Sequence, residues 1–191
     1  MAAYIDGFNV YYGMSRKGWR DRLWLDYRSL MEAILRPGQE LVRVAYFTAL
    51  SNNHDSQRRQ KTYIRALEAR GGLEVIYGKI TPRSMSCGAC DHRWKRPQEK
   101  ESDVGMTVQM LADAYARRMD EVWVMSRDTD FRPAVEHLAI NLRVKVIIVP
   151  PPSGSTTRPT TRSTPSWQNR PAIDHSTSNK SSIAFTNCPT Q

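Results

Sequence analysis

Short apolar runs alternate with segments of helical period along the first 149 residues of the chain. Such alternation is typical of βαβ units, in which helices cover a parallel sheet. Five strands are predicted, at Ala2–Asp6, Leu41–Ala49, Leu73–Ile80, Glu121–Ser126 and Arg143–Val149. Four helices are predicted between them, at Asp26–Leu35, Ser56–Arg70, Asp103–Met119 and Phe131–Asn141. We therefore expect an α/β fold of the Rossmann-like class with a mainly parallel sheet.

The third predicted helix has an apolar stripe at positions i, i+4, i+7 and i+11. Its members are Val104, Val108, Leu111 and Tyr115. Side chains at this spacing lie on one side of a helix, so we expect the stripe to face the sheet.

The composition changes abruptly at Pro150, and residues 150–191 are mostly Ser, Thr, Pro and Asn. Such a segment buries too little apolar surface to offset the entropy of ordering it. The sequence therefore predicts one domain over residues 1–149 and a disordered Ser/Thr/Pro-rich tail over residues 150–191.

The chain has 28 Lys and Arg against 19 Asp and Glu, a net charge of +9. The tail holds four of the basic residues and one of the acidic ones, so the predicted domain is itself net basic. A positive surface attracts polyanions over long distances, which makes RNA a natural partner. The alternative is a solubilising surface with no specific partner.

No apolar run approaches the roughly 20 residues that a membrane-spanning helix needs, and the first nine residues do not resemble a signal peptide. Three cysteines, an odd number, argue against a disulfide framework and for a reducing compartment. We therefore expect a cytoplasmic protein that does not enter a membrane. The sequence leaves both a monomer and a homo-oligomer open.

Acidic residues follow two of the predicted strands. Asp6 ends the first strand, and Asp128 and Asp130 come just after the fourth. Right-handed crossovers bring the first and fourth strands close to the topological switch point, where ligands bind beyond the carboxyl ends of the strands. We therefore expect these three carboxylates to lie together. Asp103 opens the helix before the fourth strand, and the topology alone does not fix its place.

Clustered carboxylates repel one another near neutral pH, and Mg²⁺ or Mn²⁺ is the usual way to stabilise them. A cation there can activate water and neutralise charge on a phosphodiester, with Asn9 and Ser126 supplying neutral hydrogen bonds. Each residue also has a structural alternative. Asp103 and Asp130 suit helix N-caps, and Asp6 and Asn9 suit a tight turn.

Three segments together resemble a known family. They are Tyr4-Ile5-Asp6-Gly7-Phe8-Asn9-Val10-Tyr11-Tyr12-Gly13, Glu99-Lys100-Glu101-Ser102-Asp103-Val104 and Ser126-Arg127-Asp128-Thr129-Asp130-Phe131. In this order they resemble the NYN domain over residues 3–149, in particular the LabA-like branch of the PIN-like nuclease superfamily. The resemblance implies a three-layer α/β/α sandwich (PIN-like) that binds Mg²⁺ or Mn²⁺ and cleaves RNA as a metal-dependent endoribonuclease. It assigns the metal-site carboxylates to Asp6, Asp103, Asp128 and Asp130, and matches Asn9 and Ser126 to its polar positions.

One position departs from the family pattern, because Arg127 stands where the second acidic motif usually has Gly. Arg resists the positive φ that Gly permits, so Arg127 either contacts a substrate phosphate or weakens the metal site. The competing function is a catalytically weak RNA-binding or regulatory module. A phosphatase of the haloacid dehalogenase type is discounted, since it needs a second Asp where this chain has Phe8.

A segment near residues 83–98 separates the third strand from the third helix and contains Cys87, Cys90 and His92. Two thiolates at this spacing can bind Zn²⁺, although a structural zinc site needs four ligands. The alternative is two thiols in a loop.

The same segment continues with Arg93, Trp94, Lys95 and Arg96. An aromatic ring among cations can stack on a base while the cations bind phosphate, so we expect these residues to bind RNA. The alternative is a solvated surface with Trp94 packed on the domain.

Overall fold

Five parallel strands form the central sheet of the computed structural model, which describes residues 1–88, 90 and 92–152. Their order across the sheet is β3-β2-β1-β6-β7. The strands are β1 (Ala2–Asp6), β2 (Arg43–Thr48), β3 (Glu74–Tyr77), β6 (Glu121–Met125) and β7 (Lys145–Ile148). The predicted parallel sheet is confirmed, and β1 pairs with β6 as the topology requires.

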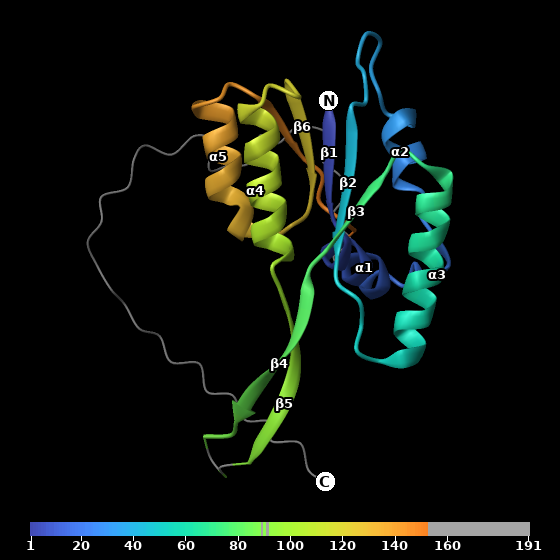
Figure 1. The fold of residues 1–191 in the computed structure, drawn as a ribbon, viewed down its shortest axis with the longest axis vertical. Helices are drawn as coiled ribbons and strands as arrows, with labels where there is room; N and C mark the ends of the chain where they lie inside the picture. The colour runs from blue at the N-terminus through green and yellow to red at the C-terminus, as the bar shows by residue number, and fades with distance from the viewer. Residues whose placement is uncertain (89, 91, 153–191) are drawn as a thin grey trace, which may run out of the picture.

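Helices cover both faces of this sheet, which makes a three-layer α/β/α sandwich (Figure 1). One face carries α1 (Gly7–Arg16), α2 (Tyr27–Ala33) and α3 (His54–Arg70). The other face carries α4 (Ser102–Tyr115) and α5 (Arg132–Ile140). Two short 3₁₀ turns, Arg20–Arg22 and Thr129–Phe131, complete the set of helices in the described part of the chain. None of the helices there is long and apolar enough to cross a bilayer.

The two hydrophobic cores follow from the alternation of side chains along β1. Tyr4 faces α4 and α5, whereas Ala3 and Ile5 face α1, α2 and α3, and all three are at most 1% exposed. A strand that is covered on both faces has apolar residues at nearly every position. For this reason β1 could be predicted from the sequence.

The sequence pattern predicts no helix before Asp26, yet α1 begins directly after β1. Asp6 caps this helix, and its carboxylate accepts a hydrogen bond from the Asn9 amide. Gly7 permits the tight connection, because a Cβ there would come within 2.7 Å of the Tyr46 ring and of the Phe47 carbonyl oxygen. The segment that resembles a turn is therefore a capped helix start.

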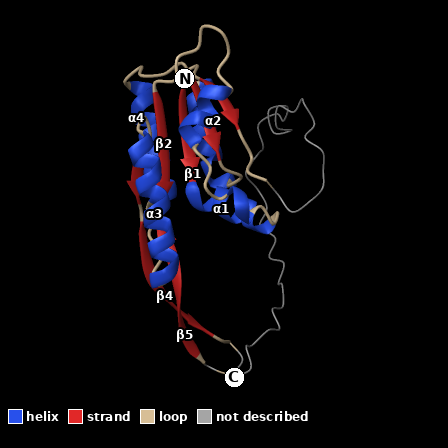
Figure 2. Cartoon of the chain, turned by 90° about the vertical axis from the view of Figure 1, so that its right-hand side faces the viewer, coloured by secondary structure: helices blue, strands red, loops and turns tan. Residues whose placement is uncertain are grey.

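The predicted strand Leu73–Ile80 is divided at Gly78 between β3 and a separate antiparallel hairpin. The hairpin pairs β4 (Lys79–Ser86) with β5 (Arg93–Lys100) and projects beyond the domain (Figure 2). A Cβ on Gly78 would lie 2.2 Å from Ser102 Oγ, so the chain can turn here only with glycine. The Cys-containing insertion is thus a β-ribbon rather than a loop.

The predicted orientation of α4 is wrong for three of the four stripe residues, and only Leu111 packs, partly buried, against the core. Val104, Val108 and Tyr115 are 59–69% exposed, and Met106 and Met110 are the buried residues that pack on the sheet. Positions 104 and 106 differ by about 200° around a helix, so the two stripes lie on opposite sides. Apolar spacing alone could not distinguish them, because the methionine stripe has the same period.

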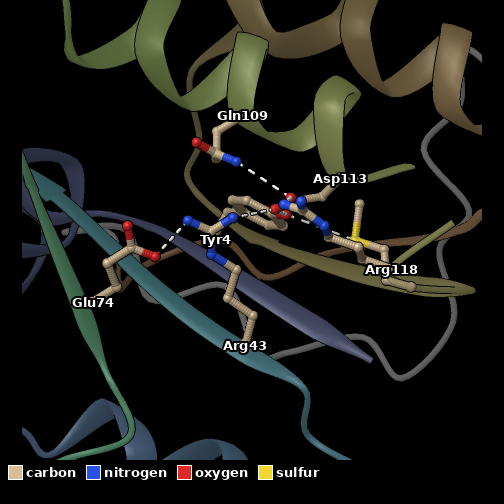
Figure 3. Close-up of polar contacts among 7 residues, drawn as sticks. Tyr4, Arg43, Glu74, Gln109, Asp113 and Arg118 are labelled. Atoms are coloured by element: carbon tan, nitrogen blue, oxygen red, sulfur yellow. Dashed lines mark hydrogen bonds and ion pairs between the residues drawn. The ribbon is translucent and has the colours of Figure 1, made fainter. Parts of the chain in front are cut away.

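A buried polar network joins α4 to the sheet at the amino ends of the strands (Figure 3). Asp113, 2% exposed at its side chain, accepts a hydrogen bond of 2.5 Å from the Tyr4 hydroxyl and forms an ion pair with Arg43. Arg118 and Gln109 donate to its other oxygen at 2.9 and 3.2 Å. The helix is thereby fixed at its carboxyl-terminal half.

Candidate active site

Asp6 lies at the carboxyl end of β1, where two hydrogen bonds fix its side chain. Its Oδ1 accepts from the Asn9 amide at 2.9 Å, and its Oδ2 accepts from Ser126 Oγ at 2.9 Å. Burial raises the pKa of Asp6, these hydrogen bonds oppose the rise, and the nearby Asp128 carboxylate adds to it. Asp6 is therefore a half-buried carboxylate held in place by both neighbouring motifs.

The second acidic motif is connected to the first by a chain of hydrogen bonds. Ser126 Oγ accepts from the Asp128 amide at 3.0 Å, and Asn9 Oδ1 accepts from the Arg127 amide at 3.1 Å. The Asp128 carboxylate in turn accepts from the Asp130 amide at 2.9 Å. Asn9 and Ser126 thus join the β1 and β6 loops, while Asp128 and Asp130 are exposed.

Arg127 occupies its position without left-handed backbone. Among the described non-glycine residues, a positive φ occurs only at Glu101, Arg117 and Arg143. The strain expected from replacing the family's glycine is therefore absent at this position. The side chain of Arg127 is exposed at the same edge as Asp128.

Asp103 lies at the same edge because α4 runs back along the sheet, which leaves its N-terminus at the carboxyl ends of the strands (Figure 1). Partial burial raises the pKa of Asp103, and repulsion from Asp6, Asp128 and Asp130 raises it further. The residue before the helix, Glu101, has a φ of 77°. Left-handed backbone at a non-glycine residue is stored strain of the kind found at functional sites.

Glu99 is a further acidic residue of this edge, and the sequence analysis did not predict it as a site residue. It pairs with Ile80 at the base of the hairpin and is half-buried. Burial raises its pKa to about 7, and Asp6 and Asp103 contribute by repulsion. Glu99 is the first residue of the second segment that resembles the NYN domain. Only the β4–β5 pairing, however, turns it toward the other carboxylates.

Five carboxylates therefore form what we call the acidic edge: Asp6, Glu99, Asp103, Asp128 and Asp130. In the part of the chain that the structure describes, no three His, Cys, Asp or Glu side chains are grouped closely enough to hold a metal ion together. The donor set still fits Mg²⁺ or Mn²⁺ in its chemistry, since Mg²⁺ usually keeps several waters and takes one or two carboxylates. The arrangement suits a hydrated cation rather than a closed cage.

The predicted zinc residues lie at the far end of the hairpin. The Cys87 amide donates to the His92 carbonyl at 2.8 Å, which closes the turn. The His92 ring stacks on Trp94 with ring centres 6.0 Å apart, and Trp94 remains 39% exposed. The described residues form no zinc ligand set, so zinc at Cys87, Cys90 and His92 stays a prediction.

The basic residues of the hairpin are exposed along its length. Directly opposite pairs join Lys79 to Lys100 and Arg83 to Arg96, and two pairs further Met85 lies opposite Trp94. Residues opposite each other in an antiparallel pair share a face of the ribbon, and like charges so placed destabilise it. The ribbon therefore presents two cation pairs and an aromatic ring on one face, at a cost to its own stability.

Comparison with known proteins identifies the family of the chain. The model of the NYN domain matches residues 1–166. The chain belongs to the NYN domain family. This family is nuclease-like and fits the PIN-like nuclease superfamily, which agrees with the α/β/α fold.

Two individual proteins are similar to this NYN chain. A curated relative, 6-hydroxy-3-succinoylpyridine 3-monooxygenase HspA of Pseudomonas putida (strain DSM 28022 / S16), is 29% identical over 186 aligned residues. The alignment covers 79% of this chain and 59% of the relative, so the chain spans less than two thirds of that protein. A solved structure, the protein of unknown function VPA0982 from Vibrio parahaemolyticus RIMD 2210633, is similar with a TM-score of 0.48 and 25% identity. The structural match covers 78% of this chain and 79% of the Vibrio chain.

Proposed function

We propose that this NYN-domain protein is a metal-dependent endoribonuclease whose site is the acidic edge. The observation that supports the proposal is that carboxylates from three separate elements share this edge: burial raises the pKa values of Asp6, Glu99 and Asp103, and repulsion from the neighbouring carboxylates adds to each rise. Such a cluster is unfavourable for the fold and calls for a cation. Clustered groups of perturbed pKa are characteristic of functional sites.

A hydrated Mg²⁺ or Mn²⁺ would be held at the predicted carboxylates Asp6, Asp103, Asp128 and Asp130, by one or two of them directly and by the others through its waters. Glu99 would lie beside them. When bound, the cation would neutralise charge on the phosphodiester and would promote the ionisation of water. Ser126 and Asn9 position the carboxylates, because their side chains are engaged in hydrogen bonds between the two loops. The proton taken from the attacking water passes to a carboxylate of the edge.

The hairpin would bind the RNA strand. Its cation pairs at Lys79–Lys100 and Arg83–Arg96 contact phosphates, and Trp94 stacks on a base. Arg93 and Lys95 add cations on the opposite face of the ribbon, and Arg127 adds a cation at the acidic edge itself. Zn²⁺ at Cys87, Cys90 and His92 would stiffen the end of the ribbon.

The experiment is cleavage of labelled single-stranded RNA by the purified chain with Mn²⁺, with Mg²⁺ and with EDTA. Wild type should cleave only with a divalent cation, and Asp128→Asn should lower the rate at least a hundredfold. Asp120→Asn, which changes an exposed carboxylate after α4, is the matched control and should keep the wild-type rate. Cleavage that is equal in wild type and Asp128→Asn would overturn the proposal.

The second candidate is an RNA-binding or regulatory module with weak catalysis. The observation that favours it is that no three carboxylates of the described residues are grouped to hold an ion. It predicts RNA binding that EDTA does not change, with no Mn²⁺-dependent products at any enzyme concentration. A filter-binding assay run beside the cleavage assay separates the two candidates.

A further inference from the structure

An aromatic cavity of about 360 Å³ lies beside the acidic edge, on the face of the sheet covered by α1 and α3. Its walls come from α1, the segment before α2, β2 and α3, and its size is within the range of small-molecule sites. The aromatic lining residues are Phe8, Tyr11, Tyr12, Trp24, Tyr27, Tyr46 and Tyr63. No residue of this cavity belongs to the acidic edge.

Three of these rings are uncovered. Tyr11, Tyr12 and Trp24 are 49%, 52% and 57% exposed. Trp24 stands edge-on to Tyr63 at 5.7 Å and 87°, and Tyr11 stands edge-on to Tyr12 at 5.4 Å and 76°. Tyr12 also stacks on Phe8, with ring centres 6.0 Å apart. Because about half of the surface of each of the three rings stays exposed, the cavity still offers aromatic surface on which a further flat ring can stack.

The inner wall of the cavity is rigid. Tyr63 donates a hydrogen bond of 2.6 Å to the Leu25 carbonyl. The Gln60 amide group donates to Thr48 Oγ1 and to the Ala49 carbonyl at 3.1 and 2.9 Å, and accepts from the Ser51 amide. Because these groups are already engaged, the wall keeps its shape and contributes mainly stacking and packing.

A cation stands at the rim. Arg59 lines the cavity, is exposed, and donates a long hydrogen bond of 3.3 Å to Ser56 Oγ. A guanidinium in this place suits a carboxylate or phosphate carried by the stacked ring. The preferred ligand is thus a flat ring that bears an anionic group.

The cavity and the acidic edge share the first turn of α1. Gly7 and Phe8 line the cavity directly after Asp6, and the Asp6 charge acts on the Tyr46 phenol. A ligand stacked against Gly7 and Phe8 therefore lies beside Asp6.

We propose that this cavity binds a flat aromatic ring carrying an anionic group, supplied in the ribonuclease as one unstacked nucleotide of the RNA strand. The nucleotide assignment rests on the proposed function. A free heteroaromatic acid also combines a flat ring with an anionic group. The experiment distinguishes this free ligand from a nucleotide of RNA. Sequence preference would then arise at the base next to the cleaved bond.

The test is titration of the full chain with uridine and adenosine 5′-monophosphates and with 6-hydroxynicotinate, followed by ligand-observed NMR in EDTA. Wild type should bind at least one of them, and Trp24→Ala should weaken binding about tenfold. Arg59→Gln changes an exposed residue and leaves the wall intact. It should weaken the binding of the nucleotides more than the binding of the matching nucleosides. Tyr115→Ala removes an equally exposed tyrosine on α4 and should leave binding unchanged.

Tighter binding of the nucleotides supports an RNA source, and tighter binding of 6-hydroxynicotinate supports a free heteroaromatic acid. Absence of binding by all three, or equal loss in Trp24→Ala and Tyr115→Ala, would overturn the proposal. Asp128→Asn should bind as wild type does, so loss of RNA cleavage and loss of the cavity's ligand are separate results. In a cleavage assay, Trp24→Ala should raise KM about tenfold with little change in kcat.

Discussion

At the scale of single residues, the acidic edge depends on side chains that are held in unfavourable states. Glu99 is half-buried near Asp6 and Asp103, and its pKa rises to about 7 from an ordinary 4.5. The folded chain therefore keeps a proton that the unfolded chain loses. Relative to a neutral side chain, the cost of Glu99 to stability is absent below pH 4.5, grows as the pH rises from 4.5 to 7, and is constant above that range.

Glu99→Gln should accordingly be more stable than wild type at pH 8, by about 1 kcal/mol once solvent screening of a partly exposed group is allowed for. The difference should vanish near pH 4, where the wild-type carboxyl is protonated in both states. Urea unfolding in EDTA from pH 4 to 8 measures it, with Glu68→Gln on the exposed surface of α3 as the control. A stability difference that does not change with pH would contradict the assignment.

At the scale of elements, the β4–β5 hairpin is a ribbon that projects from the domain and carries like charges opposite each other (Figure 2). Two guanidinium groups, of Arg83 and Arg96, face the same side at the middle of the ribbon. An arrangement that destabilises the free ribbon becomes favourable when a polyanion lies on it. The element is therefore interpreted as a nucleic-acid contact rather than a structural support.

The double variant Arg83→Gln with Arg96→Gln should bind single-stranded RNA more weakly. The slope of log affinity against log salt should decrease by about 1.4, which is two phosphate contacts of a single strand. The thermal midpoint should be unchanged or slightly higher. The matched control removes two cations from the exposed surface of α3, Lys61→Gln with Arg65→Gln, and an equal change of slope in that control would argue for non-specific attraction.

At the scale of the whole molecule, the network around Asp113 fixes α4 at the end opposite to Asp103 (Figure 3). Burial opposes ionisation of Asp113, but the hydrogen bond from Tyr4 and the ion pairs with Arg118 and Arg43 outweigh it and lower its pKa. A buried ion pair that loses one partner is strongly destabilising. The position of Asp103 at the acidic edge therefore depends on contacts at the far end of its helix.

Asp113→Ala should lower the free energy of unfolding by about 3 to 5 kcal/mol at pH 7. Because the folded-state pKa lies below the ordinary 3.8, the stabilisation is present above that pH and is lost as the pH falls through the folded-state value. Chemical unfolding at pH 7 and pH 3 should therefore show a smaller difference at pH 3. Glu32→Ala, which breaks an exposed pair with Arg28, should cost less than about 1 kcal/mol, and an equal cost in both variants would contradict this role.

The amino-acid sequence by itself determined the sheet and part of the site. Buried parallel strands are continuous apolar runs, so β1, β2 and β6 could be located, and their order placed Asp6 beside Asp128 and Asp130. These relations depend on local patterns and on the handedness of crossovers, both of which a single sequence contains. The motifs that resemble the NYN domain likewise lie in contiguous segments, and the family is confirmed.

Only the tertiary structure decided which side of α4 is buried, that the insertion is a ribbon, and that Glu99 joins the carboxylates. The methionine and valine stripes of α4 have the same period, so packing against the sheet had to select one. Glu99 reaches the acidic edge through pairing with Ile80 across the hairpin, a contact between residues 19 positions apart. The aromatic cavity is likewise assembled from four segments and has no local signature in the sequence.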